Sequence, residues 1–214
     1  MRYKGIIFDL DGVICSTDEY HYRAWKTLAD RLGIPFDRER NNRLRGVSRM
    51  ESLEIVLEKG GRTYTGEEKA AFAEEKNTLY RQLLAQMTPA DLADEVKETL
   101  ESLRRSGLKL AIGSSSKNTP FILERIGLGS FFDAVADGNC ITRSKPDPEV
   151  FLKAAEMLGL APADCLVAED ARAGVEAAVA GGFDCAAIGD AREDIRAVWH
   201  LHRFSDLRRC VMNR

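Results

Sequence analysis

The sequence predicts an α/β protein with a parallel sheet flanked by helices and a separate block of helices inserted after the first strand. Two observations support this fold class. Short apolar runs alternate with helical patterns from residue 88 onward, as in parallel sheets that are covered on both faces. The segment 17–87 instead contains helical patterns without a convincing strand. We therefore expect a core domain formed by residues 1–16 and 88–214, and a helical cap domain formed by residues 17–87.

The expected strands are short apolar runs, and each expected helix combines helical spacing of apolar residues with a start or stop signal. The strands are 4–8, 108–112, 134–136, 165–168 and 185–188. In the cap, one helix is capped by Thr17 and ends at Gly33. A second begins at Ser48 with a capping box to Glu51, and a third covers 66–87. In the core, helices are expected over 92–106, 119–126, 149–158 and 173–180.

Composition excludes several classes of partner. The chain has 214 residues, 30% of them charged, with a formal net charge of -3 and no basic block, so we expect no nucleic acid. Its five cysteines are scattered without a C-x-x-C spacing, which is typical of reduced cytosolic thiols. No stretch reaches the roughly 18 apolar residues of a membrane span, so we expect no membrane. We predict a cytoplasmic monomer that acts on a small molecule.

Two acids directly follow the first strand. Asp9 and Asp11 flank one leucine, and Gly12 then allows a sharp turn. Residues two apart on an extended chain point the same way, so both carboxylates can face one volume at the carboxyl edge of the sheet, where open α/β folds bind ligands. A hard cation such as Mg²⁺ would relieve their repulsion. The alternative is a strand end that carries two solvated acids.

Other strand ends carry polar groups that phosphoryl transfer would use. Ser114 and Ser115 follow the second core strand and offer hydroxyl and N–H donors to phosphoryl oxygens, although a serine-rich turn capping the next helix has the same pattern. Lys145 precedes a proline, which favours extended backbone and can hold its ammonium toward the sheet edge; by itself it could be a surface lysine.

A second acidic pair, Glu169 and Asp170, follows the next strand. It can complete the oxygen shell of a cation that Asp9 and the backbone carbonyl of Asp11 begin, or it can be an acidic start to a helix. Asp9 is the natural nucleophile, because carboxylate attack on phosphorus gives an aspartyl phosphate. Asp11 can then act as general acid and base, provided that its pKa is higher than that of Asp9.

These residues, in this order, resemble the four motifs of the haloacid dehalogenase superfamily of phosphotransferases, nearly along the whole chain. The core matches are 9–13, Ser114, 145–146 and 169–170. The helical insert is similar to the cap of the β-phosphoglucomutase-like branch, with matches at Thr17, 19–21, 23–25, 45–49, 76–77, 116–118 and 144–146. The resemblance implies a Rossmann-like core and an inserted α-helical cap.

The resemblance also implies roles for cap and loop residues. Asp9 would be phosphorylated and Asp11 would shuttle the proton, while Asp9, Asp11, Glu169 and Asp170 would hold Mg²⁺. Ser114 and Lys145 would bind the transferring phosphoryl group. Arg49 would grip the distal phosphate of the sugar, and Thr17, His21 and Lys76 would couple cap closure to the placement of Asp11. The remaining matched residues are expected to bind substrate: Gly46, Val47, Ser48, Ser115, Ser116, Lys117 and Asn118.

The residues by themselves also allow simpler interpretations of the cap. His21 could be a hydrogen-bonded or surface histidine, Ser48 a plain N-cap, and Lys76 a solvated ion-pair lysine. His200 and His202 have the spacing of a metal pair, but no third ligand is near in sequence, so we interpret them as surface histidines.

The implied reaction is the Mg²⁺-dependent interconversion of β-D-glucose 1-phosphate and β-D-glucose 6-phosphate, with β-glucose 1,6-bisphosphate as intermediate and activator. The alternatives are a sugar-phosphate phosphatase that uses the same aspartyl phosphate, and a catalytically idle binding domain on the same fold.

Overall fold

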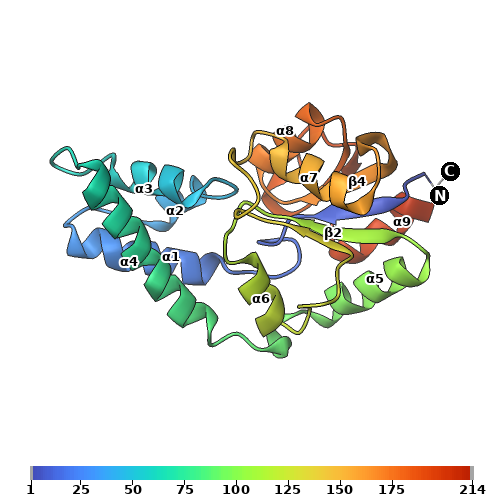
Figure 1. Cartoon of the computed structure of the whole chain (residues 1–214), viewed down its shortest axis with the longest axis horizontal. Coiled ribbons are helices and arrows are strands. Elements are labelled where there is room, and N and C mark those ends of the chain that lie inside the picture. The colour runs from blue at the N-terminus through green and yellow to red at the C-terminus, as the bar shows by residue number, and fades with distance from the viewer. Residues whose placement is uncertain (1, 213–214) are drawn as a thin grey trace.

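A six-stranded parallel sheet forms the centre of the core (Figure 1). The computed structural model describes residues 2–212. The strand order is β3-β2-β1-β4-β5-β6. The strands are β1 (Gly5–Phe8), β2 (Lys109–Gly113), β3 (Ala134–Ala136), β4 (Cys165–Glu169), β5 (Asp184–Ala187) and β6 (Trp199–His200). Because β1 pairs with both β2 and β4 in parallel, the residues that follow these three strands meet at one edge.

The helices cover both faces of this sheet, as expected for a buried parallel sheet. On one face, β1 contributes Ile6 and Phe8 to an apolar cluster with α5 (Asp94–Arg105), α6 (Thr119–Arg125) and α9 (Leu207–Met212). On the other face, Ile7 packs with α7 (Glu149–Leu158) and α8 (Arg172–Ala180). The alternation of side chains along β1 therefore anchors both layers, and Figure 1 shows α7 and α8 opposite α5 and α9.

The segment after β1 forms four helices with an apolar cluster of their own. These are α1 (Asp18–Arg31), α2 (Arg38–Asn42), α3 (Arg49–Leu57) and α4 (Gly66–Leu84). Their cluster is built around Trp25, Leu28, Leu53 and Val56, each at most 1% exposed. Figure 1 shows these helices to one side of the sheet. The α/β class with a helical insert is thus confirmed, whereas the exact domain boundaries stay a prediction.

Most elements lie where the sequence predicts them, with shifts of a few residues at their ends. Helix α3 opens with the predicted capping box between Ser48 and Glu51. Thr17 stands at the start of α1 but makes no side-chain capping hydrogen bond, since its hydroxyl contacts Asp11 instead. Helices α2 and α9 and strand β6 have no clear signal in the sequence, because they are short and a two-residue strand has no periodicity to detect.

All five cysteines are free. Within the described part of the chain, no helix combines the length and the apolar character that crossing a membrane requires.

Candidate active site

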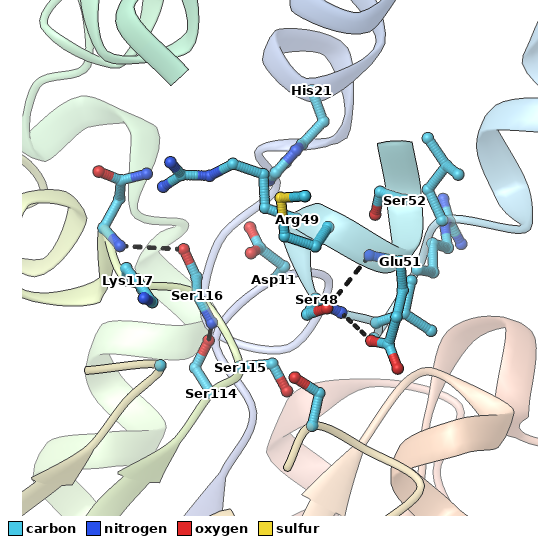
Figure 2. A pocket seen from close by; sticks show the side chains of 18 of the residues that line it. Asp11, His21, Ser48, Arg49, Glu51, Ser52, Ser114, Ser115, Ser116 and Lys117 are labelled. Carbon is cyan, nitrogen blue, oxygen red and sulfur yellow. Dashed lines mark hydrogen bonds between the residues drawn. The ribbon is translucent and has the colours of Figure 1, made fainter. Parts of the chain in front are cut away.

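Three segments at separate strand ends, together with one loop of the cap, line a cavity of about 1120 Å³. Asp9 and Asp11 follow β1, and the serine loop 114–118 follows β2. Glu169 is the last residue of β4, and Asp170 follows it. The cap loop 45–49 closes the opposite side. Figure 2 shows Asp11 between Ser48 and Arg49 of the cap and Ser114, Ser115, Ser116 and Lys117 of the core.

The lining includes almost every residue that the sequence analysis proposed for the site. The exceptions are Thr17 and Lys145, which are buried behind it. Thr17 donates a hydrogen bond to Asp11, and Lys145 contacts Asp9. His200 and His202 lie elsewhere and are exposed, in agreement with their interpretation as surface residues. The chemical roles of the assembled residues stay predictions.

Lys145 is the central cation of the core side. It is 1% exposed, and its Nζ lies 2.5 Å from Asp9 Oδ1 and 2.6 Å from Glu169 Oε1. Burial lowers the pKa of Lys145, but the charges of Asp9 and Glu169 outweigh burial and raise it above the ordinary value. Lys145 therefore stays charged and fixes the orientation of both carboxylates.

Glu169 is held on both of its oxygens. Its Oε1 accepts from Lys145 and its Oε2 accepts from the Ala171 backbone N–H at 2.8 Å. The helix behind it fits closely, because a Cβ on Gly174 would lie 1.8 Å from Glu169 Oε1. These contacts make Glu169 an anchor for Lys145, and both Glu169 and Asp170 line the cavity with Asp9 and Asp11.

The three aspartates of the site repel one another. Burial, followed by the charges of Glu169 and Asp9, raises the pKa of Asp170 to about 9. Burial raises the pKa of Asp9 to about 7 although Lys145 opposes the shift, and raises the pKa of Asp11 to about 6 although the Thr17 hydrogen bond opposes it. This order is the reverse of the one expected for Asp11 as the general acid, which requires a cation that keeps Asp9 ionised. Such a cluster of buried carboxylates gains stability from a positive ion at its centre.

The available donors fit Mg²⁺. Within residues 2–212, no three His, Cys, Asp or Glu side chains converge in the geometry of a closed metal cage. Mg²⁺ does not require one, because it is commonly held by one or two carboxylates together with waters and substrate phosphates. Asp9, Asp170 and the Asp11 carbonyl would supply hard oxygen ligands of this kind. Gly12 allows the approach of Asp170, since a Cβ there would lie 2.0 Å from its Oδ2.

The serine loop presents hydroxyl donors to the cavity. Ser114 Oγ accepts from the Ser116 N–H, and Ser116 Oγ accepts from the Asn118 N–H, both at 3.2 Å (Figure 2). Both hydroxyl hydrogens therefore remain able to donate to a ligand oxygen. Ser115 Oγ is buried and has no hydrogen-bond partner among the described residues. Lys117 is exposed at the rim.

The cap supplies a second cation across the cavity. Arg49 begins α3, is about a quarter exposed and lies 3.6 Å from Glu74. Gly46 gives the preceding loop its sharp turn with a φ of +76°. Arg45, next to this glycine, bridges to Asp18 at the start of α1 and to Asp190 of the core. The loop that carries Arg49 is thereby tied to the core.

The other cap residues form a buried polar network beside Asp11. Lys76 Nζ lies 2.9 Å from His21 Nδ1. Burial and the neighbouring charges of Lys76 and Arg49 hold the pKa of His21 well below its usual range. Burial and the charge of Arg49 likewise lower the pKa of Lys76.

Sequence reasoning missed two residues of the cap contacts, Tyr80 and Arg81. Tyr80 donates to Thr17, and Arg81 donates to Asn118 at 3.2 Å. Tyr80 stands four residues after Lys76, so helical spacing could have placed it on the same face of α4. Arg81 has no comparable sequence signal.

Comparisons with known proteins agree with this geometry. The family model of haloacid dehalogenase-like hydrolases matches residues 3–182. The chain is 42% identical over 206 residues to β-phosphoglucomutase of Bacillus subtilis, covering 95% of this chain and 91% of that one. It is 32% identical over 184 residues to a phosphorylated carbohydrates phosphatase of Thermotoga maritima, covering 85% and 82%.

The structure also matches that of a solved relative. The crystal structure of β-phosphoglucomutase from Clostridium difficile superposes with a TM-score of 0.90 at 36% identity, covering 96% of this chain and 93% of that one. The strand-end residues, the helical insert and these likenesses lead to one conclusion: the chain belongs to the haloacid dehalogenase-like hydrolase family.

Proposed function

We propose that the chain interconverts β-D-glucose 1-phosphate and β-D-glucose 6-phosphate through an aspartyl phosphate on Asp9. One observation carries the proposal: a cationic group lies on each side of the cavity, Lys145 directly behind Asp9 and Arg49 in the cap lining. A bisphosphate that must bind in two orientations needs a phosphate site at both ends, and the guanidinium fork of Arg49 suits the distal one. The likeness to the Bacillus subtilis enzyme supports the same reaction.

The reaction would proceed by two transfers. In the first, an Asp9 oxygen attacks phosphorus of the bisphosphate, the bond from phosphorus to the sugar oxygen breaks, and Asp11 donates a proton to that oxygen. In the second, the hydroxyl of a sugar monophosphate attacks the phosphorus on Asp9, Asp11 takes its proton, and the Asp9 carboxylate is released. The sugar bisphosphate then reorients, so that its other phosphate faces Asp9.

Residues around Asp9 and on the cap side would hold the two phosphates. Lys145 and the hydroxyl of Ser114 would bind the phosphoryl oxygens near Asp9, and Ser116, Lys117 and Arg49 would hold the distal phosphate. Mg²⁺ held by Asp9, Asp170 and the Asp11 carbonyl would screen the charge of the phosphoryl group from the attacking carboxylate. A closed cap would exclude water, which favours transfer to a sugar hydroxyl.

The remaining expectations belong to the same proposal. Residues 17–87 would move as a cap over the core formed by 1–16 and 88–214. Glucose 1,6-bisphosphate would act as activator, because it phosphorylates Asp9. A cytoplasmic location and a monomeric state stay predictions.

A coupled assay tests the proposal. With β-glucose 1-phosphate, Mg²⁺ and a catalytic amount of β-glucose 1,6-bisphosphate, we expect glucose 6-phosphate without stoichiometric release of inorganic phosphate. Asp9→Asn should abolish this activity, and Arg49→Gln should weaken transfer to the sugar more than hydrolysis.

The second candidate is a sugar-phosphate phosphatase, which the likeness to the Thermotoga maritima phosphatase favours. Phosphate release equal to the substrate consumed, with no glucose 6-phosphate formed, would establish that reaction instead.

A further inference from the structure

Tyr80 lies at the meeting point of the cap network and the first strand-end loop. It belongs to α4 and is 1% exposed. Its ring centroid lies 4.1 Å from that of His21 and 4.1 Å from Lys76 Nζ. Its hydroxyl lies 3.1 Å from Oγ1 of Thr17, a residue that is fully buried. Tyr80 therefore contacts three residues of the proposed site and is itself among the residues that line the cavity.

The number of hydrogens settles the direction of these bonds. A threonine hydroxyl carries one hydrogen, and that of Thr17 points to Asp11 Oδ1. The bond with Tyr80 must then run from the phenol to Thr17 Oγ1. If the two hydrogen bonds ran the other way, from a protonated Asp11 to Thr17 and from Thr17 to Tyr80, the buried phenol hydrogen would lose the acceptor that it has now. An unpaired buried donor is destabilising, which favours the first direction.

We infer that Tyr80 is a positioning residue that makes Asp11 Oδ1 a permanent hydrogen-bond acceptor and so leaves Oδ2 as the oxygen that exchanges a proton with the sugar. The inference rests on the proposed function, in which Asp11 is the general acid and base. In this role the Tyr80 hydroxyl acts through Thr17, which accepts its hydrogen bond. Without the Tyr80 hydroxyl, the Thr17 hydroxyl can rotate or reverse, and Asp11 no longer presents one defined oxygen to the reacting group.

Tyr80→Phe isolates the hydroxyl, because the ring against His21 and Lys76 is retained. We expect kcat of the mutase reaction to fall by about fivefold, the size of one neutral hydrogen bond, with KM for β-glucose 1-phosphate unchanged within about twofold. Tyr22→Phe is the matched control, since it removes a tyrosine hydroxyl from α1 at a ring that packs on Phe36 instead. It should leave kcat unchanged.

A double-mutant cycle with Thr17→Val tests the route of the effect. Once the Thr17 hydroxyl is absent, Tyr80→Phe should cause no further decrease in kcat. If the two effects multiply, Tyr80 does not act through Thr17 and the inference is wrong. Melting temperatures of all variants identify any general loss of stability.

Phosphorylation by acetyl phosphate separates the inference from structural damage. In that reaction the Asp9–phosphorus bond forms, the bond to the acetyl oxygen breaks, and acetate leaves as an anion without a proton from Asp11. The rate of phosphoenzyme formation, followed by acid quench and intact mass, should therefore be the same in Tyr80→Phe and the wild type. Equal slowing of both reactions would overturn the inference. A wild type that forms neither phosphoenzyme nor glucose 6-phosphate would overturn the proposed function itself.

Discussion

Replacing Lys145 with methionine should expose the electrostatic basis of the site. The side chains have similar volume, so the main change is the loss of one positive charge between Asp9 Oδ1 and Glu169 Oε1, at 2.5 and 2.6 Å. Both carboxylates are buried, and neither has another cationic contact among the described ion pairs. Removing one partner of a buried ion pair commonly costs about 3–5 kcal/mol.

The pH sets an upper limit to this cost. The folded variant can restore the original net charge of the site by protonating one carboxyl group. Relative to the unfolded chain, where that group has an ordinary pKa of about 4.3, the protonation costs about 4 kcal/mol at pH 7.5 and about 1.6 kcal/mol at pH 5.5. We therefore expect Lys145→Met to lower the free energy of unfolding by about 3–4 kcal/mol at pH 7.5 and by less than about 2 kcal/mol at pH 5.5.

Urea unfolding at both pH values, in buffer with EDTA, measures these differences. Lys69→Met is the control, because Lys69 forms a surface pair with Glu54 at 2.7 Å, and exposed pairs contribute at most about 1 kcal/mol. A loss for Lys145→Met below about 1 kcal/mol at pH 7.5, or one that grows as the pH falls, would refute the reasoning.

Three further predictions concern the turn after β1, the bridge between cap and core, and the cap network. Gly12→Ala should lower kcat by ~10-fold or more and weaken the apparent affinity for Mg²⁺ in a titration of activity, because the added Cβ would lie 2.0 Å from Asp170 Oδ2 and the backbone φ is +82°. Gly61→Ala is the control and should change neither quantity, because a Cβ added there would have no neighbouring atom within 4 Å. Asp190→Asn removes the core partner of the Arg45–Asp190 ion pair, which joins the cap loop to the core. In the coupled assay, the phosphate released per glucose 6-phosphate formed should rise by about two- to fivefold. An unchanged ratio would exclude a role of this ion pair in cap closure. His21 has a pKa well below its usual range, so the unfolded chain binds the proton first as the pH falls below about 6.5 and stability is lost there. His21→Gln should therefore remove a slope of up to about 1.4 kcal/mol per pH unit from urea unfolding measured between pH 6.5 and 5, and a variant with the wild-type slope would contradict this.

Local patterns were sufficient to predict most of the fold. The strand that ends before Asp9 is a short apolar run, and the capping box that begins α3 lies within the four residues from Ser48 to Glu51. In both cases neighbouring residues determine the secondary structure. Parallel pairing of β1 with β2 and β4 then follows from the alternation of strands and helices. The two-residue strand β6 depends on its pairing with β5, and it has no local signal of its own.

The site could be predicted as a set of residues but not as a set of contacts. The sequence placed Glu169 among the expected metal ligands, which stays a prediction, but gave no sign of its contacts with Lys145 and the Ala171 N–H. Tyr80 and the Arg45 bridge to Asp190 were not anticipated, since their partners lie 63 and 145 residues away in the chain.

The sequence alone determined which groups reach the carboxyl edge of the sheet, because strand periodicity, glycine turns and helix caps act over a few neighbouring residues. Only the tertiary structure decided which oxygen each of these groups contacts. Hydrogen bonds and buried ion pairs depend on distances of a few tenths of an ångström between segments far apart in the chain, and packing of the cap against the core sets those distances.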